Sequence, residues 1–316
     1  MAIFAVVLQS VLALIGIGVI GFWILRRGII PEHVIVFLSR LAIDIALPCV
    51  VFAGILINFD PKKIPDWWQL PLWWVAFEAI AFALMFATMF VSRKSTRSEF
   101  ALSLFFQNGL FFPLIVISGI FGASSPYVVQ LFIFIIFHPV LFFGTAPLFF
   151  RAEKGTHRFN MARIINPVLV STVLAVTIRL LGLETYLPRF LITMFTLLGG
   201  MTLPLLMIIL GGSLYIDFQK KGPIYLGELL KFVAVKNLLF PLVFIWLLAL
   251  VRPSYDIALI LFLQAAVPPI TGTAVHVERA GANASIANQF ILASFAASVI
   301  SIPLVFTLFS WFFPFQ

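Results

Sequence analysis

The segment FFQNGLFFPLIVISGIFG, residues 105–122, has the length and hydrophobicity of a membrane-spanning helix but contains features that oppose one. Two amide side chains, Gln107 and Asn108, are followed by Gly109 and then by Pro113. Amides are costly in hydrocarbon, and proline removes a backbone donor and breaks the helical ladder. The segment therefore predicts a spanning helix that is interrupted, with its polar side chains at the interruption.

The rest of the chain is also strongly apolar. Of its 316 residues, 62% are hydrophobic and only 10% are charged, and the mean hydropathy is +1.14. A soluble domain has about 25% charged residues, so the composition predicts a polytopic membrane protein. The net charge of +8 is not accompanied by a basic, aromatic surface module, so we expect no nucleic-acid partner.

Apolar runs of spanning length predict an all-α integral membrane protein with ten transmembrane helices. The runs cover residues 2–25, 34–58, 68–91, 99–121, 127–150, 165–183, 188–215, 230–251, 255–276 and 286–312. The first run lacks a positive segment before it and is too long for the apolar core of a signal peptide, so we expect it to be retained as a span.

Basic residues predict the orientation of these spans. With the N-terminus outside, the inner loops and helix ends hold fifteen of the 20 basic residues. The outer side then holds five, namely Lys62, Lys63, Arg179, Arg189 and Arg252. This positive-inside bias predicts that both termini lie on the outer side of the membrane. We expect that membrane to be a plasma or inner membrane.

The longest inner loop divides the chain into two halves with five spans each. We expect a first repeat at residues 1–150, a connecting loop at 151–164 and a second repeat at 165–316. An odd number of spans per half makes the repeat inverted. QNGLFFP in the fourth span and QAAVPPITG in the ninth place helix breakers at matching positions, which indicates a transporter's central binding site.

The interruptions of the two helices predict an anion-binding site. A broken helix exposes backbone N–H groups at the start of its second half, and these hold anions without a fixed cation. Asn108, Gln107 and Gln264 add amide groups, and Thr271 adds a hydroxyl. The alternative is structural, because prolines also kink membrane helices and amides also join them.

Several motifs together resemble the auxin efflux carrier family, which includes the plant PIN proteins and bacterial malate and malonate permeases. They are LSRLAIDIALPCVVFAGI, QNGLFFPLIVISGIFG, PLLMIILGGSL and QAAVPPITGTAVHVERAG. The last is the most specific, and the resemblance covers essentially the whole chain.

The resemblance implies a ten-helix inverted repeat of the PIN and bile-acid-transporter type, in which broken helices four and nine cross. Spans 1, 2, 6 and 7 would form a scaffold that dimerises, and the other six a transport domain that moves as an elevator. In the family an asparagine at the crossing contacts the substrate carboxylate, and Asn108 matches that position. The expected substrate-binding residues are Gln107, Asn108, Gly109, Pro113, Gln264, Pro268, Pro269, Thr271 and Gly272.

Two departures from the plant members bear on the substrate. Plant members carry an acid and a lysine near the start of the third span, where this chain has PDWWQLPLWW. The chain also lacks a long hydrophilic central loop. The resemblance therefore favours a small carboxylate, such as a dicarboxylate, over a flat aromatic hormone.

Ionisable residues inside the predicted spans are functional hypotheses. Arg40 and Asp44 are four residues apart and are expected to pair on one helix face, with coupling to an ion as the alternative role of Asp44. Glu78 has no partner nearby in sequence and is a candidate proton carrier, and His138 is a candidate titrating group. Lys236 is expected to extend to the membrane interface or to attract anions.

We therefore expect a secondary carrier for a small organic carboxylate, with no cofactor and with H⁺ or Na⁺ as possible coupling ions. A sodium-coupled organic-anion symporter of the bile-acid type is the main alternative, and an anion channel a further one. An enzyme is not expected, since the aspartates Asp44 and Asp217 lie outside any GxGD motif and no HExxH motif occurs.

Overall fold

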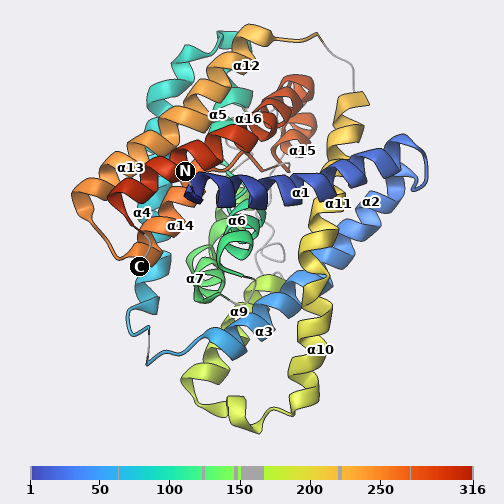
Figure 1. The fold of residues 1–316 in the computed structure, drawn as a ribbon. Helices are drawn as coiled ribbons and strands as arrows, with labels where there is room; N and C mark the ends of the chain where they lie inside the picture. The colour runs from blue at the N-terminus through green and yellow to red at the C-terminus, as the bar shows by residue number, and fades with distance from the viewer. Residues whose placement is uncertain are drawn as a thin grey trace.

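In a computed structural model of the protein, every regular element within the described residues is a helix (Figure 1). The structure describes residues 2–62, 64–122, 125–145, 149–150, 167–219, 223–270 and 272–314. In this part of the chain, six helices are long and apolar enough to cross a membrane: Phe4–Arg26, Glu32–Asn58, Trp67–Val91, Arg189–Ile216, Leu226–Val251 and Ala284–Phe312. Shorter apolar helices accompany them, so the chain is an all-α membrane protein, and the count of ten spans remains a prediction.

The fifth predicted span differs from its expected form. Residues 127–150 were expected as one helix, but the structure has α7 (Pro126–Phe134) and α8 (His138–Thr145) with a turn between them. In a continuous helix the ring of Pro139 would clash with the carbonyl of Ile135, four residues earlier. The turn removes this clash and places His138 at a helix start.

Two long helices contain a π-helical segment just before a proline. The first joins α2 (Glu32–Arg40) to α3 (Leu47–Asn58) through Leu41–Ala46, and α3 has Pro48 in its first turn. The second joins α12 (Leu226–Val233) to α13 (Phe240–Val251) through Ala234–Leu239, and α13 has Pro241 in its first turn. The wider π turn accommodates a residue that donates no backbone hydrogen bond.

The helices pack as two groups. The first group is α1 (Ala2–Arg26), α2, α3, α9 (Pro167–Leu180), α10 (Arg189–Gly200) and α11 (Thr202–Gln219), in which α1 packs on α11 and α3 packs on α9 and α10. The second group is α4 (Leu70–Thr88), α5 (Arg97–Phe105), α6 (Phe111–Phe121), α7, α12, α13, α14 (Tyr255–Ala266), α15 (Gly272–Arg279) and α16 (Ala284–Phe312). Figure 1 shows α3, α9 and α10 gathered at one end of the molecule, away from α12 and α16. The two groups meet where α1 contacts α6 and α16 and where α3 contacts α7.

Glycines bring α1 and α11 together. A side-chain carbon on Gly211 would collide with the carbonyl of Gly18, and one on Gly21 would collide with the backbone of Ile208. Small residues allow the close backbone approach through which membrane helices attract one another by van der Waals contact. The α1–α11 pair is therefore a tightly packed unit within the first group.

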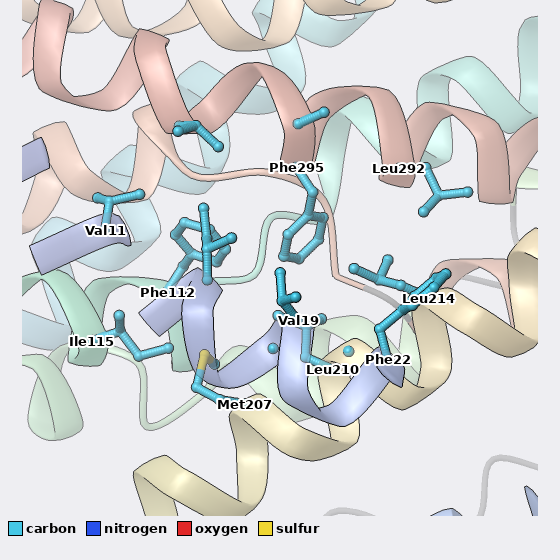
Figure 2. Close-up of a pocket in the computed structure, with 15 residues that line it drawn as sticks. Val11, Val19, Phe22, Phe112, Ile115, Met207, Leu210, Leu214, Leu292 and Phe295 are labelled. Carbon is cyan, nitrogen blue, oxygen red and sulfur yellow. The ribbon is translucent and has the colours of Figure 1, made fainter. Parts of the chain in front are cut away.

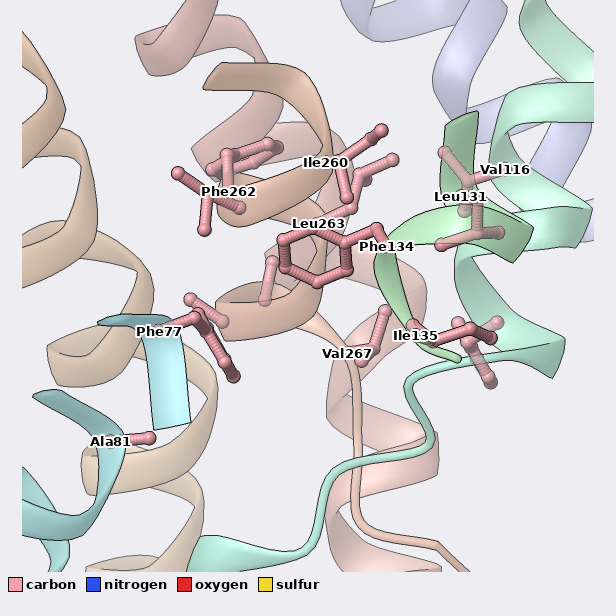
Figure 3. Close-up of a cluster of buried hydrophobic side chains, with 14 of the residues drawn as sticks. Phe77, Ala81, Val116, Leu131, Phe134, Ile135, Ile260, Phe262, Leu263 and Val267 are labelled. Carbon is pink, nitrogen blue, oxygen red and sulfur yellow. The ribbon is translucent and has the colours of Figure 1, made fainter. Parts of the chain in front are cut away.

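The largest apolar core lies within the second group, around the two interrupted helices. Phe134 of α7 lies beside Ile260 and Leu263 of α14 in this cluster, and Phe77 of α4 lies nearby (Figure 3). Leu263 is completely buried, and the exposed fraction of Phe134 is 1%. This core fixes α14 against α4 and α7, and so it fixes the position of the chain break that follows α14.

Candidate functional site

The two interrupted helices cross at their breaks. The helix α5 ends at Phe105 and α6 begins at Phe111, while α14 ends at Ala266 and α15 begins at Gly272. The intervening segments pair as short antiparallel strands through an isolated bridge between Gln107 and Pro269. The interruptions expected from the sequence are therefore present, and they contact each other.

Backbone hydrogen bonds hold this crossing together. The N–H of Asn108 donates to the carbonyl of Pro268 at 2.8 Å, and the N–H of Ile270 donates to the carbonyl of Phe106 at 3.0 Å. Unpaired backbone groups are costly in the interior of a membrane protein, where water is scarce. Each broken helix thus satisfies backbone groups of the other.

Local sequence explains why each helix restarts where it does. The side-chain Oδ1 of Asn108 accepts a hydrogen bond of 3.2 Å from the N–H of Phe111, the first residue of α6. Pro113 lies in the first turn of α6, where a missing N–H costs little. On the other segment, the consecutive prolines Pro268 and Pro269 hold the preceding residues in extended conformations.

A network of buried amides links the crossing to the neighbouring helices. The Nε2 atom of Gln264 donates to the carbonyl of Gly109 at 2.7 Å. The Nε2 atom of Gln107 donates to Oε1 of Glu78 at 3.0 Å and lies 3.5 Å from Oε1 of Gln264. The exposed fractions of Gln264, Gln107 and Asn108 are 0%, 1% and 3%. These amides are fixed by partners within the protein.

Gly109 has no room for a side chain. A carbon added there would lie 2.5 Å from Oε1 of Gln264, whose own side chain is completely buried. The glycine at this position thus permits the hydrogen bond that ties Gln264 to the crossing.

A cluster of ionisable side chains lies next to this network. Glu78 has no partner nearby in sequence, and its partners come from other helices: its carboxylate accepts the bond from Gln107 and lies 3.4 Å from Nδ1 of His138. One of the two roles expected of Lys236, extension to the membrane interface, is wrong, because only 1% of the residue is exposed. Its Nζ lies 5.1 Å from the centre of the Phe240 ring. Sequence neighbours do not reveal the partners of Glu78.

Some polar atoms of this cluster have no hydrogen-bond partner among the described residues. They are Oε2 of Glu78, both ring nitrogens of His138, and Nε1 of Trp74. The ring of Trp74 lies edge-on to that of His138, with 6.5 Å between the ring centres. Buried polar atoms generally bind ordered water when they have no protein partner. These buried atoms are therefore available as hydrogen-bond donors and acceptors beside the crossing.

The predicted pair of Arg40 and Asp44 does not form. Both side chains are exposed, and within the described part of the chain no ion pair joins them. The physical reason is the π-helical segment at Leu41–Ala46, because its wider turn changes the spacing that places residues i and i+4 on one face. Asp44 thus lies apart from the buried cluster at the crossing.

A model of a known family, described as a membrane transport protein, matches residues 6–306. The chain belongs to the auxin efflux carrier family of membrane transporters. The match runs through both interrupted helices and confirms the family resemblance seen in the sequence. No curated protein matches the chain.

Membership of this family makes the protein a transporter and not an enzyme. Within the residues that the structure describes, no group of three or more His, Cys, Asp or Glu side chains is placed to hold a metal ion.

The structure brings most of the predicted binding residues together. Gln107, Asn108, Gly109, Gln264, Pro268 and Pro269 lie at the crossing, and Pro113 and Gly272 lie in the first turns of α6 and α15. Thr271 lies outside the described residues. The helix starts of α6 and α15 follow directly from the crossing, so their partial positive charges face this region of the protein.

Three cavities occur elsewhere in this transporter. An apolar cavity of about 280 Å³ lies among α1, α6, α11 and α16 (Figure 2). A cavity of about 500 Å³ has Gln9, Ser10 and Ser118 in its lining. A third of about 760 Å³ has Asp66 and Asp256 in its lining. Asn108 and Gln107 do not line any of these three cavities.

Proposed function

We propose that the protein is a secondary active transporter of a small organic carboxylate, such as a dicarboxylate, held at the crossing of the fourth and ninth spans. One observation carries the proposal, namely the backbone pairing of Asn108 with Pro268. This pairing brings the N-terminal ends of α6 and α15 into one buried region, where their backbone N–H dipoles favour the binding of an anion. Because Gln107 and Asn108 are buried in this structure, substrate entry is proposed to require a second conformation.

We propose a ten-span inverted repeat for the whole chain. Its halves are residues 1–150 and 165–316, joined by residues 151–164, which lie outside the described part of the structure. Two matched features support the repeat. The fourth and ninth spans are both interrupted, and the second and seventh are both irregular near Pro48 and Pro204, at the π-helical segment and at the α10–α11 junction.

An elevator mechanism accounts for the two groups of helices. The first group corresponds to spans 1, 2, 6 and 7, the proposed scaffold, and the second to spans 3–5 and 8–10, the proposed transport domain. The crossing and the Glu78 cluster both belong to the second group. Transport would move this group, with its bound anion, past the scaffold.

Coupling is proposed to run through Glu78 and His138, which lie 3.4 Å apart. A proton on Glu78 would change the charge next to Gln107, and so change how the crossing accepts an anion. Asp44 remains a second candidate, although its exposed position does not bring it near the anion.

Sodium coupling of the bile-acid type is a second candidate function, favoured by one specific observation. That type of site uses an acidic residue at the crossing, and the crossing segments themselves contain none. Glu78 supplies a carboxylate from α4, through its 3.0 Å contact with Gln107. A hard cation such as Na⁺ binds carboxylate, carbonyl and amide oxygens, all of which occur here.

We propose a location in the plasma or inner membrane with both termini outside, on the basis of the positive-inside bias. We also propose a homodimer through the scaffold. Arg40 and Asp44 are exposed on the second span, and charged groups on a helix surface within a membrane are stabilised by partners. In a two-fold dimer, Arg40 of one copy would face Asp44 of the other.

The test is uptake into proteoliposomes with a panel of mono- and dicarboxylates, while proton and sodium gradients are imposed separately. We expect saturable uptake of a small carboxylate, stimulated by one of the gradients and by unlabelled substrate on the opposite side. Flux without saturation or trans-stimulation would indicate a channel. Uptake of none of the carboxylates would contradict the proposal.

A further inference from the structure

The apolar cavity lies between the tightly packed α1–α11 pair and the helices α6 and α16 of the second group (Figure 2). Its lining includes Val11 and Phe22 from α1, Leu210 from α11, Phe112 from α6 and Phe295 from α16. All fifteen lining residues are apolar or glycine. The cavity therefore lies on the boundary between the two groups, and none of the crossing residues 106–109 and 267–270 lines it.

Such a cavity requires an apolar occupant. Protein interiors are close-packed, and a water molecule in a cavity needs two to four polar partners, which this lining does not provide. Val19 lines the cavity, yet 59% of it is exposed, so the cavity opens at the outer surface of α1. Six helices in the described part of the chain, α1 among them, are long and apolar enough to span a membrane, so the medium at an exposed face of α1 that no second copy covers is lipid hydrocarbon.

The cavity has the length of a single lipid tail. Val11 and Phe22 mark its extent along α1, and eleven residues of α-helix rise about 16 Å. The hydrocarbon core of a bilayer is about 30 Å thick, so each leaflet contributes about half of that depth. The cavity thus extends along α1 over about one leaflet.

Positive charge lies at the end of the cavity marked by Phe22. Arg26 follows Phe22 by one helical turn and so lies on the same face of α1. The guanidinium of Arg27 lies 5.9 Å from the centre of the Trp23 ring, a pairing typical of the membrane interface. In the described part of the chain, neither arginine forms an ion pair with an acidic side chain. Glu32, across the turn that follows, is exposed.

We propose that this cavity binds one acyl tail of an anionic phospholipid, whose headgroup lies at Arg26 and Arg27. The tail would fill the apolar boundary between the α1–α11 pair and α16, and the arginines would select lipids of negative charge. This site is separate from the carboxylate site and does not depend on which substrate is transported.

The first test is photo-crosslinking of the full-length protein in nanodiscs with phosphatidylglycerol carrying a diazirine near the middle of one acyl chain. We expect peptides of α1 and α16 that line the cavity to carry most of the label. The substitution Ala296→Phe places a ring in the cavity and should reduce that label to background. The matched control Ile20→Phe, on an exposed part of α1 outside the cavity lining, should leave it unchanged.

The second test addresses the headgroup. Native mass spectrometry should show that phosphatidylglycerol is retained in preference to phosphatidylcholine. Arg26→Gln and Arg27→Gln should each lower that preference about fivefold, the usual effect of one basic residue near an anionic surface. Arg189→Gln, at the start of α10, should not lower it.

Three outcomes would overturn the proposal. They are label spread evenly over all exposed helices, cavity label that survives Ala296→Phe, and equal retention of the two lipids by the unaltered protein. If Ala296→Phe does not fold, the distribution of label on the unaltered protein still decides between a cavity site and a uniform lipid shell.

Discussion

The crossing of the interrupted helices and the boundary between α1 and α16 are both internal surfaces, yet they are built in opposite ways. At the crossing, backbone groups form hydrogen bonds of 2.8 and 3.0 Å, and the completely buried Gln264 donates a hydrogen bond to the carbonyl of Gly109. At the boundary, apolar side chains enclose a cavity of about 280 Å³. Polar, close-fitted contacts resist change, whereas apolar contacts with free volume allow neighbours to slide. The difference supports the proposal that the crossing moves as one unit and that the two groups slide past each other at the boundary.

The largest effect should come from the buried carboxylate beside the crossing. Replacing Glu78 with Leu leaves Nε2 of Gln107 without its buried acceptor, which should reduce the free energy of unfolding by about 3 kcal/mol, the upper end for a buried donor left unsatisfied. The double variant Glu78→Leu with Gln107→Leu should recover part of that loss. The measurement is thermal unfolding in detergent. Additive losses in the double variant would show that the two groups do not interact.

The next largest loss of stability should come from a side chain added at Gly109, where the crossing has no room for one. Gly109→Ala should displace Gln264 from the Gly109 carbonyl and leave a buried amide unsatisfied, at a cost of about 1–3 kcal/mol. Uptake should fall with it. Gly227→Ala is the matched control, because nothing lies within 4 Å of the added carbon. Equal stability of both variants would mean that the crossing tolerates change as readily as the protein surface.

The pH dependence of uptake tests whether Glu78 carries the coupled proton. If protons accompany the anion, uptake rises as the external pH falls, because protonation of the carrying group becomes more frequent. Glu78→Gln should flatten that profile, and His138→Phe should change its shape. Asp44→Asn should have no effect, since Asp44 is exposed and apart from the crossing. A profile unchanged by Glu78→Gln would remove Glu78 from the coupling path.

The smallest effect on stability is expected at the boundary. Ala296→Phe adds volume where a cavity already exists, so the free energy of unfolding should change by about 1 kcal/mol or less, below the usual cost of overpacking. The rate of transport should fall more clearly, because the ring obstructs sliding between the groups. Stability can be read from thermal unfolding and rate from uptake into proteoliposomes. A large loss of stability would show that the boundary is as closely fitted as the crossing.

Local features of this protein were readable from its sequence because they depend on neighbouring residues. Prolines and amides in residues 105–122 predicted an interruption, and Asn108 lies at it as expected. Contacts between helices that are distant in the sequence could not be predicted from it. The pairing of Glu78 with His138 joins α4 to the start of α8, and Lys236 is buried by the packing of a π-helical segment. The π turns themselves follow from prolines, but hydropathy alone does not distinguish them from α-helix.

The central claim is that the crossing holds the anion, and Asn108→Asp tests it most directly. Aspartate keeps an oxygen to accept the N–H of Phe111, so the helix start should survive, but it adds a negative charge at the proposed anion-binding site. The control is Asn283→Asp, the same change at the start of α16, where Asn283 accepts a bond of 3.2 Å from Ile286. Calorimetry with the transported carboxylate should show affinity reduced about tenfold or more in Asn108→Asp, as expected for juxtaposed like charges, and unchanged in Asn283→Asp. Unaltered affinity in a folded Asn108→Asp variant would contradict the account.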